Sequence, residues 1–80
     1  MAWAVRIGEY VTRAMVDMDD QTQTAFLMAM VDLGQDPFRG SLLGPKEFQR
    51  TVPLGDLGVI SYTVLEDELA VEILSITWIG

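Results

Sequence analysis

The sequence has 80 residues, of which twelve are acidic and five are basic, giving a formal net charge of −7. It contains neither cysteine nor histidine. Thiol chemistry, zinc sites built from Cys and His, and histidine acid–base catalysis are therefore excluded by residue inventory. Because proteins bind nucleic acids mainly by neutralising phosphates with Lys and Arg, the negative charge argues against a nucleic-acid partner.

Length and patterning predict a single domain over residues 1–80, with no signal peptide and no membrane partner. The absence of cysteine fits a reducing compartment, so we expect a cytoplasmic protein. Half of the residues are hydrophobic, a large share for so small a chain, which suggests that a partner covers part of the surface.

The N-terminal residues predict a strand followed by a helix. Trp3, Val5 and Ile7 alternate with smaller or polar residues, which is typical of a short strand with one apolar face. Gly8 is expected to end this strand. From Glu9 to Met18 the apolar residues are spaced three and four apart, which predicts a short helix.

An acidic cluster, Asp17, Asp19 and Asp20, follows this helix. Asp is a poor interior helix residue and a good N-cap, so the cluster is best interpreted as the boundary between two helices. The alternative is a divalent-cation site, but the Gly and terminal Glu of an EF-hand loop are missing. We therefore predict no metal site and no cofactor.

Residues 21–33 form the clearest predicted helix. Ala25, Phe26, Met30 and Leu33 make an apolar stripe, and we expect Leu27 and Val31 to widen it. Gly34 is predicted to be the left-handed residue past the helix end, with Pro37 preventing continuation. Met28 lies beside the stripe and is the methionine that best fits a partner-binding surface.

The middle of the chain predicts a long loop over residues 36–45 and a strand over residues 46–54. Phe48, Arg50, Val52 and Leu54 occupy alternate positions of that strand. Pro53 cannot donate a ladder hydrogen bond and should lie near an edge or at the strand end. A turn at 55–56 follows.

The last third predicts an antiparallel hairpin, with strands at 57–65 and 69–79 on either side of an acidic break at 66–68. Ile60, Tyr62 and Val64 share one face of the first strand. Over residues 71–78 of the second strand, the apolar residues occupy odd-numbered positions up to Ile73 and even-numbered positions from Leu74 on. This change of face requires a bulge or burial on both faces. The last strand is therefore predicted to be central in the sheet.

These elements define the fold class as α+β, in the order β-α-α-β-β-β. Two N-terminal helices would pack on one face of a small, mostly antiparallel sheet, with the first strand beside the last one. The other sheet face would remain open and could bind a partner.

This element order and several local patterns resemble the RelE/ParE superfamily of bacterial type II toxins, over nearly the whole chain. The matching stretches are 33–37 (LGQDP), 52–58 (VPLGDLG), 59–64 (VISYTV) and 71–76 (VEILSI). These motifs are mostly hydrophobic patterns and turn residues, so they specify fold better than activity. The resemblance implies a RelE/ParE-like fold and a small antitoxin protein as partner.

The sequence departs from the resemblance where the superfamily's nucleases carry basic or His residues. Val59 stands at the position of the Arg in its first motif, and Thr77 and Trp78 stand at the positions of its terminal Arg-His pair. No basic tail follows before Gly80. RNA cleavage needs cations at the phosphates and a group that moves protons, so the resemblance implies a degenerate nuclease site.

Three residues remain weak catalytic candidates: Arg50, Lys46 and Tyr62. Arg50 and Lys46 could form a residual phosphate site, although Arg50 is better interpreted as paired with Glu47 or Glu72, and Lys46 as solvated. Tyr62 could supply a hydroxyl, but a Tyr within a strand usually supplies a packed ring.

Partner-binding candidates are Trp78, Met28, Phe38 and Trp3. Trp78 has two open interpretations, a core residue of the last strand or an exposed anchor, because Trp is a preferred hot-spot residue.

The leading hypothesis is a toxin-fold protein that acts by protein–protein binding. The alternatives are an endoribonuclease with a reduced basic site, and a structural module that forms a homodimer.

Overall fold

The computed structural model describes residues 3–43 and 46–78, with the backbone alone for residues 41–43 and 46–48. The element order is β1 (Ala4–Ile7), α1 (Glu9–Val16), α2 (Asp20–Gln35), β2 (Ser41–Leu43), β3 (Lys46–Leu54), β4 (Gly58–Leu65), a 3-10 turn (Glu66–Glu68) and β5 (Ala70–Trp78). The strands form a five-stranded sheet in the order β1-β5-β4-β3-β2. Only β1 pairs in parallel, with β5, so the predicted α+β fold with a mostly antiparallel sheet is confirmed.

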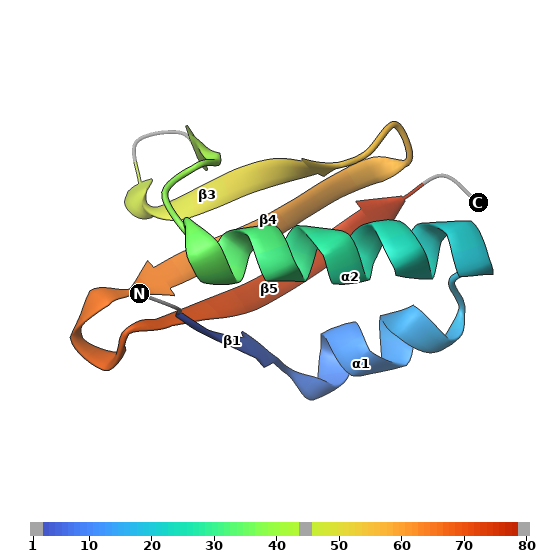
Figure 1. Ribbon diagram of the computed structural model, residues 1–80, viewed down its shortest axis with the longest axis horizontal. Coiled ribbons are helices and arrows are strands. Elements are labelled where there is room, and N and C mark those ends of the chain that lie inside the picture. The colour runs from blue at the N-terminus through green and yellow to red at the C-terminus, as the bar shows by residue number, and fades with distance from the viewer. Residues whose placement is uncertain (1–2, 44–45, 79–80) are drawn as a thin grey trace.

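Both helices cover the same face of the sheet (Figure 1). Helix α1 contacts β5, and helix α2 contacts β1, β3 and β5. Side chains from both helices, from the connection between them and from three strands form one core cluster, which consists of Val11, Met18, Phe26, Met30, Leu33, Leu54, Ile60, Tyr62, Val71, Ile73 and Ile76. The opposite sheet face carries no helix of the described chain.

The acidic residues between the helices act as caps. Asp19 is the N-cap of α2, and its carboxylate accepts a hydrogen bond from the Thr22 backbone N–H at 2.8 Å. Hydrogen bonding by the Thr22 side chain and, to a smaller extent, this backbone bond lower the pKa of the Asp19 carboxyl from its ordinary value of 3.8. Asp17 is the C-cap of α1. The capping interpretation of the acidic cluster is therefore confirmed for these two residues.

Helix α2 continues to Gln35 instead of ending at Leu33, because Gly34 is part of the helix and does not stop it. Gly34 lies inside the helix rather than beyond it in a left-handed conformation. Its carbonyl accepts the Trp3 backbone N–H at 2.7 Å, and an added Cβ would lie 3.3 Å from the Trp3 carbonyl oxygen. The missing side chain therefore lets the chain entering β1 approach the helix closely.

The hairpin of β4 and β5 carries the predicted bulge. Ser61 pairs with Ser75, but the next residue, Tyr62, pairs with Ile73, so Leu74 has no partner of its own. The extra residue returns Ile76 to the same face as Ile73, and both are buried. Strand β5 lies between β1 and β4, which confirms its predicted central position.

The predicted loop at 36–45 contains a short edge strand that the sequence pattern did not reveal. β2 pairs with β3 through Ser41 opposite Thr51 and Leu42 opposite Arg50. Three residues between glycines are too few to show a strand period. Pro53 lies beyond this pairing and opposes Val59 alone, so its missing N–H faces an open edge.

No helix in the described ranges 3–43 and 46–78 is both long enough and apolar enough to cross a membrane.

Candidate functional site

Tyr62 is fully buried on the helix-covered face of β4. Its hydroxyl donates a hydrogen bond to the Pro37 carbonyl at 2.7 Å and accepts one from the Gly40 N–H at 3.1 Å. Burial raises the pKa of the phenol above its ordinary value of 10.0, against smaller lowering effects from the Gly40 bond and Arg50. The phenol is therefore neutral at physiological pH, and both of its hydrogen-bonding functions serve the backbone.

Arg50 lies opposite Tyr62 in the β3–β4 register, on the same sheet face. Its Nη1 donates to the Phe38 carbonyl at 3.2 Å and to the Gly40 carbonyl at 2.8 Å. The guanidinium carbon also lies 5.3 Å from the centre of the Phe38 ring, within cation–π range. The expected pairing of Arg50 with Glu72 is wrong, because Glu72 opposes Thr63 on the other sheet face.

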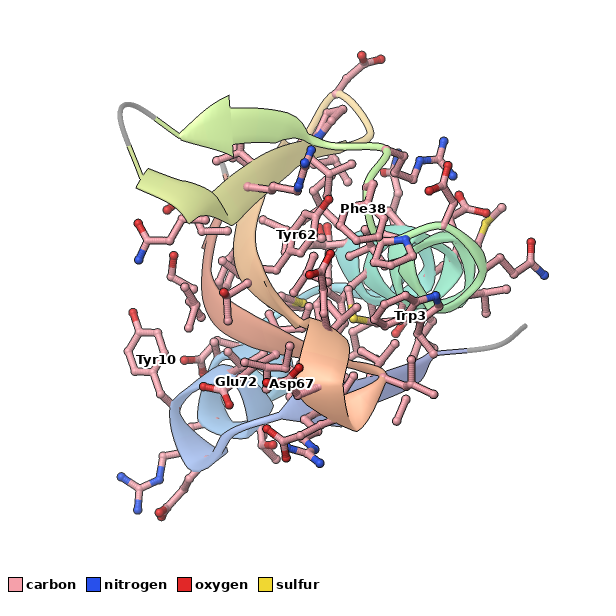
Figure 2. The ribbon with its side chains drawn as sticks, turned by 90° about the vertical axis from the view of Figure 1, so that its left-hand side faces the viewer. Trp3, Tyr10, Phe38, Tyr62, Asp67 and Glu72 are labelled. Atoms are coloured by element: carbon pink, nitrogen blue, oxygen red, sulfur yellow. The ribbon has the colours of Figure 1, made fainter. Side chains whose placement is uncertain are left out.

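Together, Arg50 and Tyr62 hold residues 37–40, the connection from α2 to β2, against the sheet. Gly40 receives contacts from both side chains, and an added Cβ there would overlap the Tyr62 hydroxyl and lie 2.5 Å from the Thr51 carbonyl oxygen. The two residues thus converge, as a catalytic pair would, but on backbone atoms of the protein itself. In Figure 2 Tyr62 lies between the sheet and α2.

Two other predicted partners of this group lie outside the described side chains. Lys46 begins β3, and Glu47 follows it, but only their backbone is described. The proposed phosphate site of Arg50 and Lys46 and the Arg50–Glu47 pair therefore stay predictions.

The open sheet face brings together two of the positions at which the superfamily resemblance implies basic residues. Val59 and Thr77 oppose each other directly across β4 and β5. Both are exposed, Val59 to 46%. The third position, Trp78, opposes Gly58 and packs against the core cluster. The geometry expected of a converging site is present on this face, with a methyl-bearing side chain and a hydroxyl in place of cations.

The next rung of the open face is also uncharged. Thr51, Ser61 and Ser75 lie opposite one another across β3, β4 and β5. Charges come only one rung further along, where Arg6 of β1 opposes Glu72 of β5. A row of hydroxyls can form hydrogen bonds with a ligand but cannot neutralise phosphates.

Each arginine in the described ranges already has a partner. Apart from Arg50, these are Arg6 with Glu68 at 2.8 Å, Arg13 with Glu9 at 2.6 Å and Arg39 with Asp32 at 3.4 Å. All three ion pairs are about half exposed or more, so each contributes little to stability. They belong to β1, α1 and the 37–40 connection, and do not gather at one site.

Two of the four partner-binding candidates form an aromatic contact at the C-terminal end of α2. The rings of Trp3 and Phe38 meet edge to face, with centroids 5.7 Å apart (Figure 2). Phe38 is 43% exposed, whereas Trp3 is half-buried and packs against the core cluster. Phe38 is therefore the more accessible of the two for a partner.

Trp78 combines its two predicted roles in part. It is half-buried and packs against the core cluster, which favours the core interpretation. It also lines a hollow of about 340 Å³ together with Asp17, Ile76 and Thr77.

Helix α2 exposes more apolar surface than predicted. Met28, the fourth candidate, is 65% exposed, and the expectation that Leu27 and Val31 widen the core stripe is wrong, since they are 55% and 62% exposed. They lie on the face of α2 opposite the buried residues Phe26 and Leu33. The signal was present in the sequence, because apolar residues surround the whole helix instead of following one stripe.

Comparisons with known proteins identify the class of fold. No protein-family model matches the chain, and no curated protein matches it. Among solved structures, a chain of the toxin–antitoxin complex RelBE2 from Mycobacterium tuberculosis superposes with a TM-score of 0.87 at 18% identity, covering 99% of this chain and 100% of that one. The archaeal RelE–RelB complex from Pyrococcus horikoshii OT3 gives a TM-score of 0.82 at 21% identity, covering 100% and 98%.

The Escherichia coli toxin RelE, solved as an Arg-to-Ala mutant in complex with a peptide of the antitoxin RelB, gives a TM-score of 0.83 at 14% identity. The match covers 100% of this chain and 86% of that one. At these identities the comparisons show the fold alone. The chain therefore has the RelE toxin fold that the sequence resemblance implies.

Proposed function

We propose that this protein is a toxin-fold component of a toxin–antitoxin pair that acts through protein–protein binding and lacks a working nuclease site. The observation that carries the proposal is the engagement of Arg50 and Tyr62. Both candidate catalytic side chains hold backbone atoms of residues 37–40. A buried neutral phenol that donates to a carbonyl is not available to move a proton, and a guanidinium that binds two carbonyls is not free to hold a phosphate.

The open sheet face supports the same proposal. Val59 and Thr77 stand together at positions where the superfamily resemblance implies cations, and the neighbouring rung consists of Thr51, Ser61 and Ser75. Cleavage of RNA by this fold would require positive charge near the developing phosphorane. The net charge of −7 opposes RNA binding further.

The proposed partner is a small antitoxin-like protein encoded beside this chain, in the cytoplasm of the host. Support comes from solved structures of the same fold, several of which are complexes of RelE with RelB. The apolar surface left exposed by α2 and Phe38 agrees with a partner that covers part of the molecule.

A growth and copurification experiment tests the pairing. The chain is induced in a bacterium alone and together with its neighbouring reading frame, and growth and copurification are measured. We expect the two products to copurify as a stable complex. Normal growth under induction combined with no copurified product would rule out the toxin–antitoxin pair.

A cleavage assay tests the absence of nuclease activity. The purified chain is incubated with ribosome-bound message, and no cleavage is expected above a buffer control. Arg50→Met serves as the second sample, after circular dichroism has shown that it is folded. Cleavage by the wild-type chain that disappears in this variant would establish the rival function, an endoribonuclease that uses Arg50.

A further inference from the structure

The middle of the outward face of α2 is apolar, between exposed polar and acidic residues toward both ends of the helix. Leu27, Met28 and Val31 lie within one turn of one another and are each more than half exposed. The opposite side of the helix is buried in the core. A helix that is apolar on both sides is typical of one that is covered on both sides. We refer to Leu27, Met28 and Val31 as the α2 patch.

The charged residues of α2 and of the adjoining stretches within residues 14–38 are all acidic. Residues 14–38 contain five Asp residues and not a single Lys, Arg or His. All five Asp residues are exposed. Asp32, which adjoins Val31 in the sequence, contacts Arg39 at 3.4 Å through a half-exposed pair that solvent screens, so most of the negative charge remains available.

This charge selects among the occupants that an apolar helix face could have. A second copy of the chain would bring the same acidic segment against itself, because a two-fold contact repeats one patch on both sides. Like charges placed across an interface oppose binding, whereas basic residues on the partner would favour it. Nucleic acid is disfavoured by the same negative charge.

The geometry of α2 selects the partner's shape. The backbone groups of a helix are satisfied internally, so the patch offers no free strand edge for an added strand. Side chains at positions 27, 28 and 31 form a ridge on a convex surface, and such ridges pack into the grooves of another helix. The sixteen residues of α2 provide room for a helix of similar length.

We propose that the α2 patch binds an amphipathic helix of a second protein, with the helix's apolar side on Leu27, Met28 and Val31 and its flanks rich in Lys or Arg. This inference rests on the proposed function and names the surface and the partner chemistry through which that function operates. Apolar contact supplies the affinity, and the acidic surroundings of α2 select partners by charge.

The test variant replaces all three patch residues, Leu27→Gln, Met28→Gln and Val31→Gln. Gln is a good helix former, and the replaced side chains are more than half exposed, so the variant should keep its helix content. Val16→Gln is the matched control, because Val16 is 79% exposed at the end of α1. Val59→Gln reports on the open sheet face.

The first probe is a pair of synthetic amphipathic peptides of about 16 residues, the length of α2. One carries Leu on one side and Lys on the flanks, and the other has Glu in place of Lys. In fluorescence anisotropy, we expect the Leu/Lys peptide to bind the wild-type chain at least about tenfold more tightly than the Leu/Glu peptide. The triple variant should weaken Leu/Lys binding by about tenfold or more, and Val16→Gln should not.

Raising NaCl from about 50 to about 500 mM should weaken binding of the Leu/Lys peptide, because salt screens exposed charges. Equal Leu/Lys affinity for the wild-type chain and the triple variant would overturn the inference. Equal affinity of the wild-type chain for the Leu/Lys and Leu/Glu peptides would overturn the selection by charge.

The second probe is the product of the neighbouring reading frame, which separates failure of this inference from failure of the proposed function. If that product copurifies with the wild-type chain and is lost from the triple variant, the inference is supported. If it binds the triple variant normally but is lost from Val59→Gln, the proposed function stands and the α2 patch is refuted. If it binds neither the wild-type chain nor any variant, the proposed function fails. Concentration-dependent dimerisation abolished in the triple variant would assign the patch to self-association.

Discussion

The Tyr62→Phe substitution removes one oxygen atom that makes two hydrogen bonds in the interior. The Pro37 carbonyl loses a donor at 2.7 Å, and the Gly40 N–H loses an acceptor at 3.1 Å. A buried polar group left without a partner costs about 1–3 kcal/mol, and the ring itself stays in place. We therefore expect Tyr62→Phe to lower the free energy of unfolding by about 2 kcal/mol.

This loss is measurable by thermal or urea unfolding followed by circular dichroism. In a chain of this size about 2 kcal/mol corresponds to a fall in Tm of roughly 8–16 °C. Tyr10→Phe is the matched control, since Tyr10 is 68% exposed and its loss should change stability by less than about 0.5 kcal/mol. A Tyr62→Phe variant as stable as this control would show that the hydroxyl does not hold residues 37–40.

Arg50→Met extends the measurement to a double-mutant cycle. This substitution keeps an apolar stem and removes the donors to the Phe38 and Gly40 carbonyls. Because Tyr62 and Arg50 both bind Gly40, the double variant should lose less stability than the sum of the single losses, with a coupling of about 0.5 kcal/mol or more. Strict additivity would mean that Arg50 and Tyr62 act independently and would refute their joint hold on residues 37–40.

Three further predictions concern single positions. Gly58→Ala should destabilise the hairpin by about 1–3 kcal/mol in urea unfolding, because an added Cβ would overlap the backbone of β5, whereas a loss below about 0.5 kcal/mol would contradict this close approach. Leu69→Gly should be neutral or stabilising by up to about 1 kcal/mol in thermal unfolding, because Leu69 has φ 50° in the left-handed region, and clear destabilisation would refute the presence of strain. In the Tyr10→Phe variant, absorbance titration should show that Tyr62 ionises above pH 10, because burial raises the pKa of its phenol. The contribution of the neutral phenol to stability is therefore complete below pH 10 and is lost as the pH rises through the pKa of the folded state. Ionisation of Tyr62 below pH 10 would contradict this prediction.

The elements with a clear period could be predicted from the sequence. The hairpin followed from alternating β-branched residues, and the bulge at Leu74 followed from the change of parity after Ile73. The position of β5 between β1 and β4 also agrees with the prediction, although the bulge leaves the strand with one buried face instead of two. Local patterns carried these predictions, and the tertiary structure agreed with them.

Features that depend on contacts far apart in sequence could not be predicted. The conformational freedom of Gly34 predicts a helix stop, but in the structure the missing side chain admits the backbone of Trp3. β2 is too short to show a period. Leu27 and Val31 were assigned to the core because apolar patterning does not reveal which side of an evenly apolar helix faces the sheet.

The sheet register could be compared with the resemblance, whereas the hydrogen-bond partners of Arg50 could not be predicted. The superfamily resemblance pointed to Val59 and Thr77, and the sheet register places them side by side. The partners of Arg50 could not be predicted, because backbone carbonyls leave no mark in the sequence. The acidic side chain expected as its partner, Glu72, lies on the opposite sheet face.

The structural use of Arg50 also bears on how function could change while the fold persists. A residue that binds Gly40 and Phe38 contributes to stability whether or not the protein cleaves RNA, so the presence of Arg50 is not evidence of catalysis. Val59 and Thr77 are exposed on the open face, where substitutions cost little stability, so cations there would persist only if a substrate required them. Arg50 bound to backbone carbonyls together with uncharged residues at 59 and 77 is the combination that the proposed binding function predicts. A catalytic chain of the same fold would need cations on the open face. The identity of the residue that holds the 37–40 connection would not matter for catalysis.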